Sequence, residues 1–177
     1  MKKLFYLAVF AALLFTSCEE VDKWTKFELD YDTNLTIPSV ISIGIPLDVT
    51  TPGIETNSES RFSLNATTKD LIEAINLTQM NLNLTAPEGG DFGFLQTVRL
   101  YIAADGQPEL LVAWKENIPS NAGTELAMDV TTADLKEYVK LDHFTIRLQT
   151  TTDELITQNH DVNIYMKFLV DAKILGQ

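Results

Sequence analysis

The sequence has little of three things on which exported proteins and enzymes commonly rely: cysteine, histidine and positive charge. Its 177 residues include one cysteine, Cys18, and two histidines, His143 and His160. A single cysteine excludes an internal disulfide and a cysteine-ligated metal cluster, and neither histidine lies in a zinc-binding pattern. With 13 Lys and Arg against 25 Asp and Glu, the formal charge is −12, which repels nucleic acid. We therefore expect no nucleic-acid partner and no cofactor.

Motifs of nucleophilic catalysis are missing as well. The sequence contains no Gly-x-Ser-x-Gly elbow. Carboxylates are plentiful, but a pair suited to glycoside hydrolysis is defined by a separation in space and not by sequence spacing. Asp30, Asp32 and Asn34 have the oxygen spacing that opens a calcium loop, yet Leu35 replaces its glycine and Ile41 its final glutamate. The sequence favours a protein that is not an enzyme.

Long apolar runs are absent except at the N-terminus, where the run is short. Two lysines precede apolar residues 4–15, and these 12 residues are fewer than the roughly 20 that span a bilayer. Two small residues, Thr16 and Ser17, then come directly before Cys18. This order predicts a cleaved lipoprotein signal peptide at residues 1–17, with Cys18 carrying a lipid that anchors the mature chain to the membrane. The alternatives are an ordinary secretory signal and a permanent N-terminal anchor.

An acidic cluster follows Cys18 immediately. Glu19, Glu20 and Asp22 lie in a tether that we assign to residues 18–23. This arrangement resembles the export signal of Bacteroidota surface lipoproteins, and the chain resembles small β-sandwich lipoproteins of that phylum whose function is uncharacterised. The resemblance implies a lipid-anchored protein of the outer membrane that faces the cell surface. The alternative is a solvated tether on a protein that faces the periplasm.

Alternation of apolar and polar residues dominates residues 24–177, as is typical of strands that bury one face. The clearest run ends the chain, at residues 162–174. Two others lie at residues 41–49 and 94–102, and the Asp105–Gly106 pair predicts a tight hairpin turn after the second. We expect one all-β domain, an antiparallel β-sandwich of about seven to nine strands.

Two segments interrupt this alternation and resemble each other. Residues 62–85 match residues 126–149 at a constant offset, with seven identities and apolar character kept at most other apolar positions. Each segment contains Thr-x-x-Asp, a variant of the capping box that begins helices. We therefore expect two short capped helices, near 68–75 and 132–139, in a strand–helix–strand unit that occurs twice.

Exposed aromatic residues would indicate sugar binding, because aromatic rings pack on sugar faces. The candidates are Trp24, Tyr31, Tyr101, Trp114, Tyr138 and Tyr165. Our first hypothesis is a non-catalytic interaction or structural module at the outer membrane. The second is a glycan-binding accessory protein of a surface uptake system. The third is a subunit of a surface fibre or assembly that uses the long last strand or an unpaired sheet edge. The sequence does not identify a protein or glycan partner.

Overall fold

The structure, a computed structural model, describes residues 25–39, 43–152 and 154–173. The predicted signal peptide at residues 1–17 lies outside these ranges, as does the rest of the N-terminal prediction: Cys18, Glu19, Glu20 and Asp22. Trp24 lies outside them too. Among the described residues, no helix has both the length and the apolar character needed to cross a membrane.

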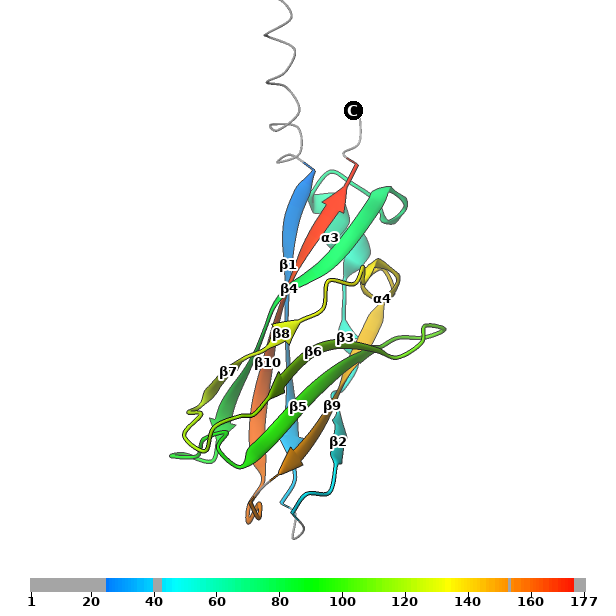
Figure 1. Cartoon of the computed structure of the whole chain (residues 1–177). Coiled ribbons are helices and arrows are strands. Elements are labelled where there is room, and N and C mark those ends of the chain that lie inside the picture. The colour runs from blue at the N-terminus through cyan, green and yellow to red at the C-terminus, as the bar shows by residue number, and fades with distance from the viewer. Residues whose placement is uncertain (1–24, 40–42, 153, 174–177) are drawn as a thin grey trace, which may run out of the picture.

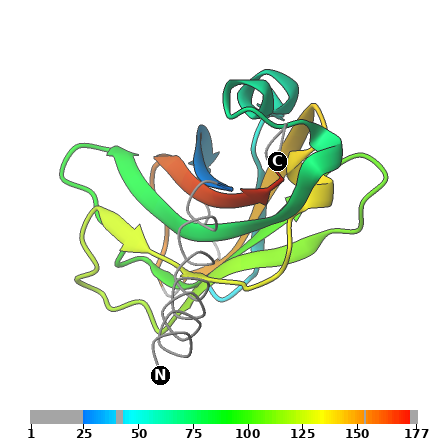
Figure 2. The ribbon, with the colours of Figure 1, turned by 90° about the horizontal axis from the view of Figure 1, so that it is seen from above.

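Two antiparallel sheets pack face to face, as Figure 1 shows from the side and Figure 2 along the strands. The four-stranded sheet has the order β1 (Lys26–Ile37), β10 (His160–Ala172), β4 (Ile72–Ala86), β7 (Glu125–Ala127). The second sheet has the order β2 (Leu47–Thr50), β9 (His143–Thr152), β5 (Leu95–Ala103), β6 (Leu110–Glu116), β8 (Asp129–Val130), and β3 (Ile54–Glu55) also pairs with β9. The all-β sandwich is confirmed, with ten strands in the described ranges instead of seven to nine.

The last strand, β10, lies inside its sheet and not at an edge. It pairs with β1 on one side, over all 12 residues of β1, and with β4 on the other. Every second residue from His160 to Ala172 is buried, which confirms the alternation predicted from the sequence. Because both sides of β10 are paired, this strand offers no free edge for assembly, and that part of the third hypothesis is wrong.

The core lies between the sheets and is joined across them by three aromatic rings. Tyr31 on β1 and Phe168 on β10 come from one sheet, and Phe144 on β9 comes from the other. The Tyr31 ring lies edge-on to both partners, with centroids 5.5 Å from Phe144 and 5.7 Å from Phe168. Edge-to-face contacts of this kind add to the stabilisation that burial itself provides.

The hairpin prediction is confirmed, but the strand predicted at residues 41–49 is correct only at its end. β5 and β6 pair antiparallel across the Asp105–Gly106 turn, where Gly106 has a φ of 73°. In the other segment β2 begins only at Leu47, and Ile43 and Ile45 are 55% and 61% exposed. Gly44 between them has a φ of 73°, a left-handed conformation that interrupts the extended chain.

Two short α-helices are present in the described ranges, and only one lies where a helix was predicted. α4 (Lys136–Val139) falls within residues 132–139 but is a single turn. Near 68–75 the helix prediction is wrong: a 3-10 turn at Lys69–Leu71 leads directly into β4. The helix α3 (Ser58–Leu64) lies earlier in the chain. The local apolar spacing fits a helix at residues 72–75, but this segment is a strand because pairing with β10 buries Ile72 and Ile75 in the core.

The structural repeat is therefore wrong, although the sequence match is real. Phe62 lies in α3, whereas the matching Leu126 lies in β7. The capping-box prediction also fails, because the Thr67 hydroxyl donates to the carbonyl of Lys173. The carboxylate of Asp134 does cap the start of α4, accepting a hydrogen bond from the Lys136 N–H, and it accepts a second from the Ile75 N–H of β4, both at 3.0 Å. One carboxylate thus joins the start of α4 to the strand β4.

Replacing Asp134 by alanine is expected to lower the free energy of unfolding by about 1–2 kcal/mol at neutral pH, because two backbone donors lose their acceptor. Burial raises the pKa of Asp134, but the N–H groups of Ile75 and Lys136 outweigh burial and the pKa is lowered. The contribution is therefore present above the unfolded-state pKa of the carboxyl and is lost as the pH falls through the folded-state value. Urea denaturation at pH 7 and pH 3 measures both effects.

The matched control is Asp70→Ala, since Asp70 occupies the equivalent position of the sequence match and is exposed. It should change the free energy of unfolding by less than about 0.5 kcal/mol. An equal loss in the two variants would contradict the assignment of Asp134.

Candidate functional site

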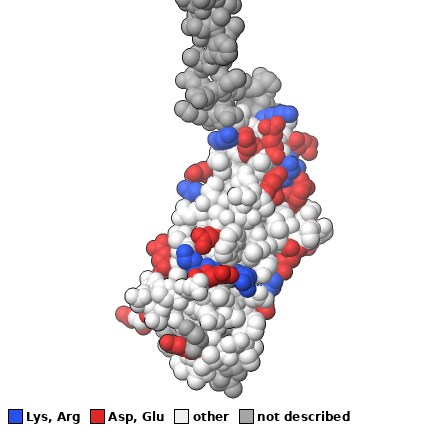
Figure 3. Space-filling view, viewed as in Figure 1, with Lys and Arg blue, Asp and Glu red and all other residues white. Residues whose placement is uncertain are grey.

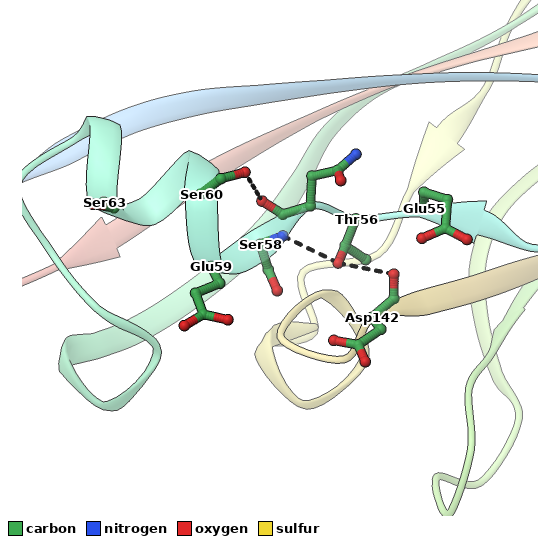
Figure 4. Close-up of a pocket in the computed structure, with 8 residues that line it drawn as sticks. Glu55, Thr56, Ser58, Glu59, Ser60, Ser63 and Asp142 are labelled. Atoms are coloured by element: carbon green, nitrogen blue, oxygen red, sulfur yellow. Dashed lines mark hydrogen bonds between the residues drawn. The ribbon is translucent and has the colours of Figure 1, made fainter.

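A polar hollow of about 600 Å³ lies beside α3, and Figure 4 shows its lining. Glu59 and Asp142 direct their carboxylates to the same side of it. The Thr56 hydroxyl donates to the carbonyl of Leu141 at 2.5 Å, with the carbonyl of Asp142 at 3.2 Å, and accepts from the Ser58 N–H at 3.2 Å. The Ser58 hydroxyl donates to the carbonyl of Lys140. These hydroxyl groups join α3 to the turn before β9. The residues that line the hollow therefore have a structural role in connecting these two segments.

No metal centre is found among the described residues: nowhere do three or more His, Cys, Asp or Glu side chains cluster so as to hold an ion. His143 is exposed at the start of β9. His160, in contrast, is only 9% exposed. Its ring lies 4.2 Å from that of Phe94, and burial lowers its pKa, so the neutral imidazole packs as part of the core.

The aromatic candidates divide into buried and surface residues. Tyr31 and Tyr138 are 4% and 6% exposed, and their hydroxyls donate to backbone carbonyls of Thr56 and Pro108. Burial raises the pKa of Tyr31 to about 12, although the nearby Arg61 guanidinium opposes the rise. Both residues therefore belong to the core and are excluded as sugar-binding platforms.

Three aromatic residues remain on the outer faces of the sheets. Tyr165 is half-buried on the four-stranded sheet, where its hydroxyl donates to the Asp30 carboxylate at 2.9 Å. Tyr101 on β5 and Trp114 on the neighbouring strand β6 are half-buried on the six-stranded sheet. Trp114 pairs with Arg99 in the sheet register, and a bulge separates this pair from Tyr101. Of the aromatic residues proposed for sugar binding, Tyr101 and Trp114 therefore lie together on one outer face.

Ion pairs fix the side chains beside these rings. The Arg147 guanidinium donates to both carboxylate oxygens of Glu109, at 2.7 and 2.6 Å, and also to Asp48. Its Cζ lies 4.3 Å from the centroid of the Tyr101 ring, so the cation packs on the aromatic face. The hydrogen bond from Arg147 lowers the pKa of Glu109, and the same contact raises that of Arg147. Both groups stay charged across the physiological range.

A second ion pair joins β5 to β6, where Arg99 donates to Glu116 at 3.0 Å. Figure 3 shows blue and red atoms in a band across the middle of this face, with a largely uncoloured surface on either side. Neutral polar groups continue the pattern: the hydroxyls of Thr97 and Thr151 lie 2.8 Å apart, and the Gln149 amide donates to Asp48. The face therefore presents fixed donors and acceptors in close alternation.

We define the sheet-face site as Tyr101, Trp114, Arg99 and Arg147 with their carboxylate partners Asp48, Glu109 and Glu116. The sequence indicated the two aromatic residues as candidates but not the two arginines. The reason is that Arg-x-Tyr on β5 and Arg-x-Gln on β9 look like the polar side of any half-buried strand. Only the pairing of β5 with β9 brings Tyr101 opposite Arg147.

Comparison with known proteins gives fold-level likenesses alone. No protein-family model matches the chain, and no curated protein matches it in sequence. The crystal structure of FlhE is similar over 82% of this chain and 98% of that chain, with 8% identity and a TM-score of 0.35. Module CBM32-3 of a family 31 glycoside hydrolase from Clostridium perfringens has 8% identity and a TM-score of 0.33, over 79% of this chain and 75% of that chain.

A virus structure shows a comparable likeness. Turnip yellow mosaic virus matches 85% of this chain and 84% of its own, with 12% identity and a TM-score of 0.31. Scores and identities this low carry no inference about a ligand or partner. The functional argument therefore depends on the residues of this chain.

Proposed function

We propose that this protein is a non-catalytic, lipid-anchored binding module that holds a neutral glycan on the outer face of its six-stranded sheet. One observation carries the proposal: two aromatic rings and two arginine–carboxylate pairs share that open face. Aromatic rings offer apolar area to the C–H faces of a sugar, and the fixed polar groups offer partners to its hydroxyls.

The charge of the sheet-face site favours a neutral ligand over an ionic one. Arg99 and Arg147 are each neutralised by carboxylates within hydrogen-bond distance. An anionic ligand would have to displace those carboxylates, in a chain that already carries a formal charge of −12. A hydroxyl group can instead donate to a carboxylate and accept from a guanidinium without breaking the ion pair.

The position of the chain ends suits presentation from an anchor at Cys18. Lys26 at the start of β1 is the register partner of Asp171 near the end of β10, so the described chain enters and leaves at one end of the sandwich (Figure 1). A lipid at Cys18 would therefore hold that end of the sandwich nearest the membrane. The outer faces of the two sheets would then extend away from the membrane and remain accessible. The cell-surface orientation is part of this proposal, and the acidic residues Glu19, Glu20 and Asp22 support it through the resemblance of their placement to an export signal.

A glycan array followed by titration calorimetry of the full-length chain tests the proposal. Trp114→Ala should weaken binding of the selected glycan about ten-fold or more, since burial of a large apolar side chain is worth about 1.5–3 kcal/mol and about 1.4 kcal/mol corresponds to ten-fold. Tyr101→Ala should also weaken binding, because it removes the ring on which the Arg147 guanidinium packs. The matched control is Tyr165→Ala, which removes a half-buried ring from the opposite sheet and should leave affinity unchanged.

Two outcomes would contradict the sheet-face site. The first is an array without any bound glycan, and the second is an equal loss of affinity in Tyr165→Ala. Urea denaturation of each variant separates a loss of binding from a loss of folding.

A further inference from the structure

A second open surface of the sandwich is the free edge of β1. In the four-stranded sheet β1 is the terminal strand, and its register partners all lie on β10. The Arg61 guanidinium donates to the carbonyl of Asp30 at 2.9 Å, which shows that this carbonyl points away from β10. In an antiparallel pair the backbone groups of alternate residues point the same way, so those of Asp32, Asn34 and Thr36 also point outward.

Arg61 marks one end of the unoccupied stretch. It covers the Asp30 carbonyl and also lies over the Tyr31 ring, with its Cζ 4.7 Å from the ring centroid. Beyond it, within the ranges that the structure describes, no strand pairs with the outward groups of Asp32, Asn34 and Thr36, although β2 and β3 of the other sheet approach β1. The backbone groups from Asp32 to Thr36 are therefore available for pairing with an extended chain.

The surroundings of this edge are hollow at both ends. At one end a hollow of about 540 Å³ is lined by Asn34 and Thr36 of β1 and by Thr50 and Pro52 of the opposite sheet, among others. At the other end a smaller hollow of about 240 Å³ includes Asp30, Arg61 and Leu64. Leu64 is 86% exposed, so it offers an apolar contact to any chain that lies along the edge.

Negative charge gathers on the outer side of the same strand. Glu28, Asp30 and Asp32 occupy alternate positions of β1, and all three are exposed. Glu28 is neutralised by Lys167 at 3.1 Å, and Asp30 accepts from the uncharged Tyr165 hydroxyl. The edge therefore keeps a surplus of negative charge, which extends through Asp161 beside Thr36.

We propose that the free edge of β1 accepts an extended strand of another protein that carries Lys or Arg at alternate positions. Pairing would satisfy the outward groups of Asp32, Asn34 and Thr36, and the basic side chains would lie against the acidic row of β1. A second copy of this chain fits less well, because antiparallel pairing of β1 with β1 about Asn34 would place Asp32 opposite Thr36 and bring no basic side chain to Asp32. This surface is distinct from the sheet-face site, so either proposal can fail without the other.

The experiment uses the isotope-labelled full-length chain in detergent micelles and the peptide acetyl-(Thr-Lys)4-amide as the probe. We expect chemical-shift changes along β1 and near Arg61, and at least ten-fold slower amide exchange at Asp32 and Asn34. Changes that map to Tyr101 and Trp114, with β1 unaffected, would overturn the proposal. The peptide acetyl-(Thr-Glu)4-amide should not bind, because its charge repels the acidic row.

Two modified peptides distinguish strand addition from simple ionic attraction. Methylation of the backbone nitrogens at every Lys alters one side of the extended peptide, and methylation at every Thr alters the other. One of these peptides should bind at least ten-fold more weakly than the other, since only one side faces β1. Equal binding of both would overturn the proposal.

A substitution in the protein provides an independent arm of the test. Asn34→Pro removes an outward N–H that pairing with β10 does not use, and proline is tolerated on edge strands. Peptide binding should fall at least ten-fold while the urea midpoint changes little. If this variant unfolds, the N-methylated peptides still decide the question with the unmodified chain.

Discussion

Replacing Phe168 by alanine is expected to lower the free energy of unfolding by about 3–5 kcal/mol, a large part of the stability of a domain of this size. Phe168 is 1% exposed on the central strand β10, and its ring contacts Tyr31 at 5.7 Å and Phe144 at 6.2 Å between centroids. Alanine would leave a cavity where the two sheets meet, and each remaining ring would lose an edge-to-face partner.

Urea denaturation followed by tryptophan fluorescence measures the effect of Phe168→Ala. The control is Leu169→Ala, the next residue of β10, whose half-buried side chain lies on the outer face of the sheet. It should cost about 1 kcal/mol or less, because less surface is buried and no cavity forms. Similar losses in both variants would contradict the assignment of the core to the inner faces.

Substitution of Gly93 by alanine should destabilise the fold by about 2–3 kcal/mol, for the opposite reason. Gly93 is buried between Phe92 and Phe94, and a Cβ there would overlap the carbonyl oxygen of Ser120. The Gly93 N–H donates to the Asp91 carboxylate within the same loop. The Phe92 N–H donates to the carbonyl of Gly123 at 2.8 Å, which holds the loop against the segment that contains Ser120. A methyl group must therefore push two connecting segments apart, as in any overpacked site.

Gly53→Ala is the matched control for Gly93→Ala. A Cβ at Gly53 would meet the side chain of His143 at 3.7 Å, which is an ordinary contact. The substitution should change the unfolding free energy by less than about 1 kcal/mol, and it can be stabilising because alanine restricts the unfolded chain. A midpoint for Gly93→Ala equal to that of Gly53→Ala would contradict the close approach at Ser120.

The strands were predictable where burial repeats with a period of two over a long stretch. β10 and β5 follow the sequence pattern because each packs one face on the core and extends without a break. The pattern fails at Ile43 and Ile45, where Gly44 turns the chain and leaves both side chains exposed. Apolar spacing alone does not report backbone conformation at a single glycine.

The helices show a different limit of sequence reasoning. The spacing of Leu71 and Ile75 fits one helical turn, yet β4 takes both Ile72 and Ile75 into the core by pairing with β10. The partner strand is almost 100 residues away, so no local signal reveals it. Asp134 was identified as a cap, but its second hydrogen bond to the Ile75 N–H depends on the same long-range pairing.

The candidate sites follow the same rule. Tyr101 and Trp114 were recognisable as aromatic candidates, whereas their contact with the Arg147 and Arg99 ion pairs depends on strands that are distant in sequence. The unpaired edge was anticipated as a general feature, but its assignment to β1 required the strand order. The sequence shows the chemical character of the residues in both candidate sites. It does not show which of these residues lie close together in the fold.

The central place of the last strand has a consequence for how the chain reaches its folded state. β10 joins β1 to β4, and the Tyr165–Asp30 hydrogen bond closes a loop of 135 residues. Until residues 160–172 are available, β1 has no partner in its sheet, so a nascent chain must remain without that half of the sandwich. Folding of such high contact order is slow, and the sandwich can close only after its last strand has been synthesised.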